Sequence, residues 1–169
     1  MTVNSINTYI VPTAPNEVTM PSQPAFLAFL GAGDTDLNVT GNAAQYVLGS
    51  GNNLTEVFDQ NADFDNTTGI FTAPVTARYF FAHSIFYLQA AGTNIALTAV
   101  VTSNRDYAWE SGGDINAANN GSAKMQLIVD MDATDTAFVI LNLTGIGANT
   151  ADAQGSATLG SYISGNLQF

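Results

Sequence analysis

Residues 78–88 read RYFFAHSIFYL, a run in which most side chains are aromatic or aliphatic. Because successive side chains of a strand point to opposite faces, this run divides into two sets. One face would carry Tyr79, Phe81, His83, Ile85 and Tyr87, and the other Phe80, Ala82, Ser84, Phe86 and Leu88. A sandwich covers only one face of each sheet, so the second apolar face needs another partner. We predict a subunit interface through Phe80, Phe86 and Leu88; the alternative is that long loops cover this face.

Other segments alternate with the same period of two. Residues 95–102 read IALTAVVT and residues 124–131 read KMQLIVDM. Turn-forming stretches such as GSGNN (49–53) and SGGDINAANNG (111–121) separate these segments, and no segment carries a helical stripe. Eight or more short strands within residues 24–169 indicate an all-β sandwich or barrel.

Residues 1–23 differ from the rest of the chain. Pro12, Pro15 and Pro21 exclude a long helix and interrupt any strand. The segment is therefore either an extended N-terminal arm or a disordered terminus. Its apolar side chains favour an arm that is ordered by contact with a partner. The residues expected to anchor it are Ile6, Tyr9, Ile10 and Val11.

Charged residues make up only 10% of the chain, against about 25% in an ordinary soluble domain. The net charge is −11, and Arg78, Arg105 and Lys124 are the only basic residues. Three scattered cations cannot replace the counterions of a nucleic acid or hold an anionic membrane surface. So few charges suggest that the surface is built from uncharged polar residues and is partly buried against other copies.

Targeting signals are also missing from the sequence. There is no cysteine, so disulfides and thiolate metal sites are excluded. The start, MTVNSINTYIVPTAP, lacks the basic and apolar regions of a signal peptide, and no stretch reaches the roughly 20 apolar residues of a membrane span. We expect a protein made in the cytoplasm that stays there or is assembled into a particle.

Residues 57–82, VFDQNADFDNTTGIFTAPVTARYFFA, carry a pattern of a known family. They resemble the globular head of the complement recognition protein, a member of the tumour-necrosis-factor-like jelly-roll superfamily. The matching residues are Val57, Phe58, Asp59, Gly69, Phe71, Thr72, Ala73, Pro74, Tyr79 and Phe81. The family usually has Gly before the Tyr of its aromatic strand, whereas Ala77 and Arg78 stand there in this chain.

Three further segments agree with the same family. PAFLAFL (24–30) looks like its first strand, IVDMDATDTAFVIL (128–141) like its hairpin with an acidic turn, and SYISGNLQF (161–169) like its closing strand. The resemblance therefore covers residues 24–169. It implies a jelly-roll β-sandwich of about ten antiparallel strands that follows the arm.

The resemblance also implies a homotrimer and a non-catalytic role. Similar heads without a collagen stalk or signal peptide occur in the fibres and surface proteins of bacterial viruses. We therefore expect a structural protein on the virion surface, as a bacteriophage fibre head or a capsid decoration. Its partners would be other virion proteins, through the arm, and a host-surface receptor. The alternative is a soluble domain that binds protein or carbohydrate outside any virus.

An acidic run suggests a weak calcium site. Asp59, Asn61, Asp63 and Asp65 place oxygen side chains at alternating positions, as at the start of a calcium-binding loop. Phe64 and Ile70 stand where an EF-hand needs Gly and Glu, so that motif is excluded. The run is either a loop that helps to hold one cation between subunits or a solvated turn. No other cofactor is expected.

Two further features have functional and structural interpretations. Arg105, Tyr107 and Trp109 could form an aromatic platform for a sugar, or a partly buried strand end. His83, the only histidine, has no second histidine for a metal site and shares a face with Tyr79 and Phe81, which favours a core position. The sequence contains no nucleophile elbow or phosphate loop, and we expect no enzyme.

Overall fold

The structure is a computed structural model that describes residues 23–42, 44–112, 119–158 and 160–168. These residues form thirteen strands in two antiparallel sheets and no helix. The predicted all-β jelly-roll sandwich is confirmed. More strands occur than the ten or so predicted, because β3, β5, β6 and β12 are pieces of two or three residues. The residues predicted to anchor the arm, Ile6, Tyr9, Ile10 and Val11, lie outside the described residues.

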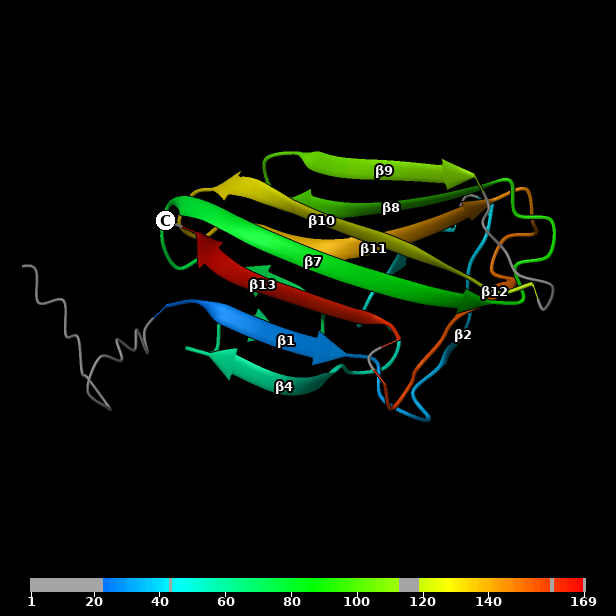
Figure 1. Cartoon of the computed structure of the whole chain (residues 1–169), viewed down its shortest axis with the longest axis horizontal. Helices are drawn as coiled ribbons and strands as arrows, with labels where there is room; N and C mark the ends of the chain where they lie inside the picture. The colour runs from blue at the N-terminus through cyan, green and yellow to red at the C-terminus, as the bar shows by residue number, and fades with distance from the viewer. Residues whose placement is uncertain (1–22, 43, 113–118, 159, 169) are drawn as a thin grey trace, which may run out of the picture.

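The first sheet contains seven strands. In spatial order they are β2 (Asp36–Thr40), β12 (Ala151–Ala153), β7 (Ala77–Leu88), β13 (Tyr162–Gln168), β1 (Ala25–Phe29) and β4 (Thr55–Gln60), with β10 (Gly121–Met131) on the other side of β7. Strands β1 and β13 come from opposite ends of the chain and lie side by side (Figure 1). The aromatic run 78–88 is thus the long strand β7, in the middle of this sheet.

The second sheet contains six strands and lies behind the first in Figure 1. In spatial order they are β5 (Phe64–Asp65), β6 (Ile70–Thr72), β11 (Thr136–Thr144), β8 (Ile95–Thr102) and β9 (Asp106–Gly112), with β3 (Tyr46–Val47) also paired to β11. Strand β9 is the edge of this sheet and lies on the same side of the sandwich as β10, the edge of the first (Figure 1).

The core between the sheets is rich in aromatic rings. Phe26 of β1 stacks on Phe64 with ring centroids 4.4 Å apart, and Phe71 meets Tyr79 and Phe81 edge to face at 5.3 and 5.6 Å. All five side chains are at most 5% exposed. Offset and edge-to-face pairs such as these stabilise a core beyond the area that they bury.

Two glycines allow close approaches that a side chain would prevent. Gly69 has φ 71°, and a Cβ there would lie 1.9 Å from the carbonyl oxygen of Leu48. Gly165 of β13 faces the core, and a Cβ would lie 2.6 Å from the ring of Phe26 and 3.0 Å from that of Phe81. These contacts give a structural reason for both glycines, which lie in two of the four segments that carry the family resemblance.

Candidate functional site

The residues of β7 that point away from the core lie on the outer surface of the first sheet. The outward side chains of β4, β1, β13, β7 and β10 form a surface that we call the outer face. Its apolar members are Leu27, Phe29, Phe58, Phe80, Ala82, Phe86, Leu88, Ile128 and Tyr162. Phe80, Phe86 and Leu88 are partly buried, whereas Phe58 and Ile128 are 50% and 55% exposed. The described loops therefore do not cover this face.

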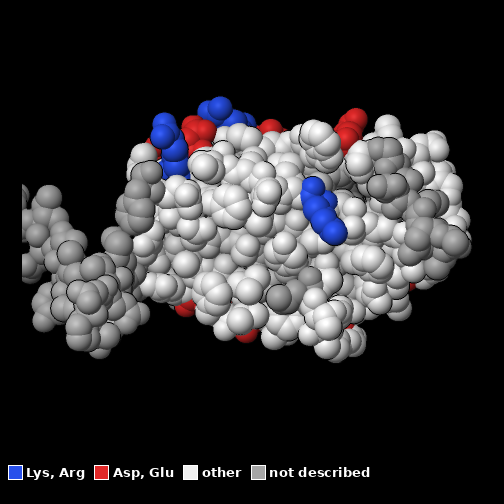
Figure 2. Space-filling model, in the orientation of Figure 1, with Lys and Arg blue, Asp and Glu red and all other residues white. Residues whose placement is uncertain are grey.

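The outer face carries few charges. Its charged members are Arg78 and Asp130, which are paired in register at one end, and Lys124, which lies opposite Ser84. Figure 2, in the orientation of Figure 1, shows a broad uncharged surface with one basic side chain inside it and charged side chains at its margins. A face of this kind is typical of a protein–protein interface.

Two hollows lie beside Lys124 on this face. One, of about 490 Å³, is lined by Ala82, His83, Trp109, Lys124, Met125, Gln126 and Tyr162. The other, of about 300 Å³, is lined by Ser84, Phe86, Ser122, Lys124, Gly160 and Tyr162. The sequence analysis did not select Lys124, Tyr162 or Ile128 as interface residues. Strand pairing brings them next to β7, and only the alternation along 124–131 could have placed Lys124 and Ile128 on one face.

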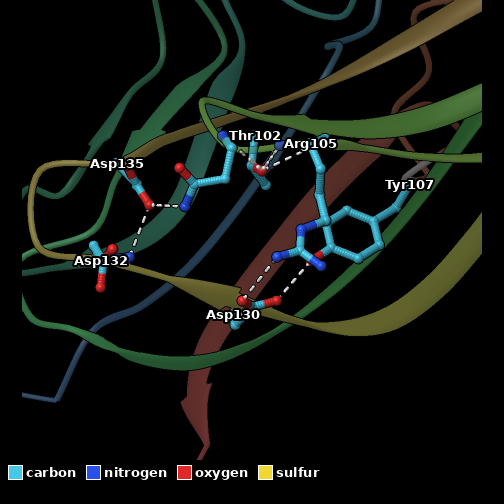
Figure 3. A network of polar contacts seen from close by, with 7 residues as sticks. Thr102, Arg105, Tyr107, Asp130, Asp132 and Asp135 are labelled. Atoms are coloured by element: carbon cyan, nitrogen blue, oxygen red, sulfur yellow. Dashed lines mark hydrogen bonds and ion pairs between the residues drawn. The ribbon is translucent and has the colours of Figure 1, made fainter.

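The predicted platform of Arg105, Tyr107 and Trp109 is only partly formed. Arg105 donates to Asp130 of β10 at 3.3 Å, and the Tyr107 hydroxyl donates to the same carboxylate at 2.9 Å (Figure 3). The guanidinium carbon lies 6.0 Å from the Tyr107 ring centre. Trp109 takes no part in this group and is 61% exposed. Arg105 and Tyr107 thus tie β9 to β10, and Trp109 alone remains available at this edge.

The same contacts shift the pKa values of Asp130 and Tyr107. The hydrogen bond from Tyr107, more than the charge of Arg105, holds the pKa of Asp130 below its ordinary value. The pKa of Tyr107 is raised, first by partial burial and then by the Asp130 carboxylate. Asp130 is therefore a charged acceptor at neutral pH and cannot serve as a proton donor there.

The acidic turn between β10 and β11 has a structural explanation. Asp135 accepts a hydrogen bond from the backbone N–H of Asp132 at 2.7 Å (Figure 3). It also accepts from the Ser103 hydroxyl at 2.8 Å and the Asn104 amide at 2.5 Å. These donors, led by the Asp132 N–H, lower the pKa of Asp135. The carboxylate thus closes the hairpin turn and joins it to the loop before β9.

The three aspartates predicted to bind calcium separate into two groups. Asp59 and Asp63 each keep one buried carboxylate oxygen without a hydrogen-bond partner. Burial, and then the charge of Asp59, raise the pKa of Asp63. Asp65 is instead exposed and accepts from the backbone and hydroxyl of Thr67 at 2.9 and 2.6 Å. In the described ranges no three His, Asp or Glu side chains are grouped to hold a metal, so calcium stays a prediction that rests on Asp59 and Asp63.

His83 lies in the core, in agreement with the strand alternation. It is 1% exposed, and its Nε2 lies 2.7 Å from the Thr98 hydroxyl, which donates to the carbonyl of Ile140 at 2.8 Å. Since the Thr98 proton is used, Nε2 carries the hydrogen and donates to Thr98. Nδ1 has no partner, and burial lowers the pKa of His83 to about 4. The ring is neutral at pH 7 and ties the two sheets together.

The whole sandwich is similar to solved structures of low sequence identity. The globular domain of the zebrafish complement 1qA protein matches with a TM-score of 0.56 at 16% identity, over 87% of this chain and 98% of that one. The fold is that of the complement globular heads. The resemblance predicted from residues 57–82 is thereby confirmed at the level of the fold.

Two other solved structures share this complement-head fold. Murine APRIL, at pH 8.0, matches with a TM-score of 0.56 at 8% identity, over 87% of this chain and 99% of that one. The vertex protein P5 of the phage PRD1 matches with a TM-score of 0.52 at 12% identity, over 88% of this chain and 98% of that one. No family model and no curated protein matches the sequence. At such identities these likenesses establish architecture and nothing finer.

Among the described residues, no helix is long and apolar enough to cross a bilayer.

Proposed function

We propose that this chain is a non-catalytic structural protein of a bacteriophage virion, a trimeric jelly-roll head of a fibre or a capsid decoration. The observation that carries the proposal is the outer face, which is apolar, nearly uncharged and uncovered by the described part of the chain. Burial of apolar surface is worth roughly 25 cal/mol per Å². A face of five strands therefore offers a strong driving force for association.

The proposed interface joins the outer face of one copy to an edge of the next. A closed ring of three needs two different surfaces on each copy, because a head-to-tail contact repeats around the axis. The β9–β10 edge supplies the second surface, since Trp109 is 61% exposed there. The resemblance to the tumour-necrosis-factor-like jelly rolls supports the number three.

The virion location has separate support. The fold is shared with the PRD1 vertex protein P5, and the sequence predicts an N-terminal arm that would dock on other virion proteins. The outward head would then face the host surface. Deleting residues 1–22 should leave a folded trimer with an unchanged melting temperature and abolish its incorporation into particles. Normal occupancy of the truncated protein on particles would contradict the anchor.

A second candidate function is favoured by Trp109. An indole that is 61% exposed beside a hollow could bind protein or carbohydrate in a soluble recognition domain. The two functions differ in where the protein is found. Antibody labelling of purified particles would support the virion component, whereas a protein found only free of particles would support the recognition domain.

The trimer is tested by light scattering of the full chain. We expect three copies of the 17.7 kDa chain, about 53 kDa, at micromolar concentration. Ile128→Asp is the sharpest variant, because Ile128 is 55% exposed and its replacement should leave the single copy folded. In the assembly, the new carboxylate would be buried without a partner. Phe80→Asp and Phe86→Asp should act in the same way.

Val75→Asp is the matched control for these variants. Val75 is 47% exposed in the turn before β7 and lies off the outer face, so its variant should stay trimeric. Circular dichroism checks that each variant is folded. A wild-type mass of 17.7 kDa, or a folded Ile128→Asp protein that remains a trimer, would overturn the proposed assembly.

A further inference from the structure

Lys124 is an isolated cation part-way along β10, the edge strand of the outer face. Its neighbours in register are Ser84 of β7 and, beyond it, Tyr162 of β13, both uncharged. Among the described residues, no carboxylate lies within ion-pairing distance of its ammonium group. Asp130, the acidic residue on the same side of β10, is six residues away and already holds Arg105 and Tyr107.

Assembly would bury this ammonium group if the outer face is the trimer interface, as the proposed function holds. Removing a charge from water costs several kcal/mol unless an opposite charge compensates it. The interface therefore needs a carboxylate next to Lys124, and the described outer face supplies none there. A second copy of the chain is the nearest source of one.

The edge strand β9 carries a carboxylate at about the same position along the strand direction as Lys124; we call this position the height. Trp109 and Lys124 line the same hollow, so they lie at a similar position along the strands. Glu110 follows Trp109, is exposed, and points to the opposite side of β9, away from its own hollow. Rotation about an axis parallel to the strands keeps this height. The edge of one copy thus brings Glu110 to the level of Lys124 on the next.

We propose that Lys124 receives Glu110 of a second copy, as an intersubunit ion pair that is repeated at each interface of the trimer. The pair compensates the buried ammonium and fixes the register of the edge on the face. Asp106 lies on the same side of β9, four residues from Glu110. A strand rises roughly 3.3 Å per residue, which puts Asp106 about 13 Å from the required height. Asp106 is therefore the matched control.

The experiment uses the full chain in four variants: Glu110→Lys, Lys124→Glu, the double exchange, and Asp106→Lys. The dissociation of the assembly is measured by sedimentation equilibrium at low and high salt. Each single reversal should weaken each interface at least about tenfold, by placing like charges together. The double exchange should recover most of this loss, and Asp106→Lys should stay near the wild type. High salt should reduce all these differences.

The outcomes separate this inference from the proposed function. A wild-type protein that stays monomeric would overturn the proposed assembly and the pair with it. If the wild type is a trimer but the double exchange loses as much association free energy as the two single variants together, the proposed pair is wrong and the assembly stands. The same holds if Lys124→Glu weakens the trimer and Glu110→Lys does not, since an anion from solution would then serve Lys124.

Discussion

The two faces of β7 have similar apolar content and different surroundings. On the inner face Tyr79, Phe81, Ile85 and Tyr87 are fully buried by the second sheet. On the outer face the apolar side chains stay partly exposed, because the described chain has no third layer. The hydrophobic residues of β7 therefore predict that both faces are buried. They do not predict which face is buried within the chain and which by a partner.

The polar residues of the two faces differ in the same way. His83, on the inner side, is held by Thr98 within the chain. Lys124, on the outer side, has no such partner among the described residues and stays in solvent in the single copy. A polar group in the core can find partners only within the fold, whereas one on an interface can also find them in a second copy. Four predictions test this contrast, from the largest effect to the smallest.

The largest effect is expected from a pair of truncations, Phe81→Ala on the inner face and Phe80→Ala on the outer face. Phe81 packs against Phe26 and Phe71, so its loss leaves a cavity and should cost about 3–5 kcal/mol of unfolding free energy. Thermal melts at several protein concentrations separate the two variants. Phe81→Ala should lower the midpoint at every concentration, and Phe80→Ala only where copies assemble. Equal, concentration-independent losses would contradict the contrast.

The next effect is the pH dependence of His83. Its pKa is lowered from 6.5 to about 4 by burial, so the unfolded chain gains a proton at a higher pH than the folded one. Its contribution to stability is complete above pH 6.5 and is lost as the pH falls toward 4, by about 3 kcal/mol. Urea unfolding of the wild type and of His83→Gln across this range measures it. Parallel curves for both proteins would show that His83 does not titrate in this way.

A smaller effect is expected from Gly165→Ala on the inner side of β13. The new methyl group would meet the rings of Phe26 and Phe81, and such overpacking costs about 1–3 kcal/mol. Ser164→Ala is the control, because Ser164 points to the outer face and is only partly buried. Chemical denaturation should show a clear loss for Gly165→Ala alone. An alanine tolerated without loss would mean that the core has room at this strand.

The smallest effect concerns Asp63. Its pKa is raised, so its charge costs stability above that pKa, and Asp63→Asn should slightly stabilise the protein at pH 7. Asp65→Asn, which weakens the bonds to Thr67, should not stabilise. Melting curves with excess calcium and with chelator test the metal. A melting temperature that rises with calcium in the wild type but not in Asp63→Asn would support a calcium site. Identical melting midpoints with calcium and with chelator would exclude the site.

The period of two along 78–88, 95–102 and 124–131 was enough to predict an all-β sandwich and to divide β7 into two faces. That division depends only on strand geometry, so it holds wherever the strand lies. The segment 57–82 predicted the complement-head fold only through its resemblance to that family. The structure adds a physical reason for two of the matching residues, because Gly69 has a positive φ and Phe71 lies in the core.

The candidate site was less predictable, because its residues meet across strands far apart in the chain. Ile128, Lys124 and Tyr162 join Phe80 and Phe86 only through the pairing of β10 and β13 with β7. Spacing in the sequence carries no information about such pairing. Short pieces such as β3 and β12 were missed for a different reason, since two or three residues show no period.

Sequence by itself determined the strand class, the two-sidedness of β7, the scarcity of charge and the core position of His83, because each depends on residue type and local alternation. Tertiary structure alone decided that Tyr107 is tied to Asp130 while Trp109 is exposed, and that Asp65 binds Thr67 and does not form a three-residue metal group with Asp59 and Asp63 among the described residues. It also decided which face of β7 lacks cover. These outcomes depend on distances between side chains from different strands, which only the packing of the two sheets sets.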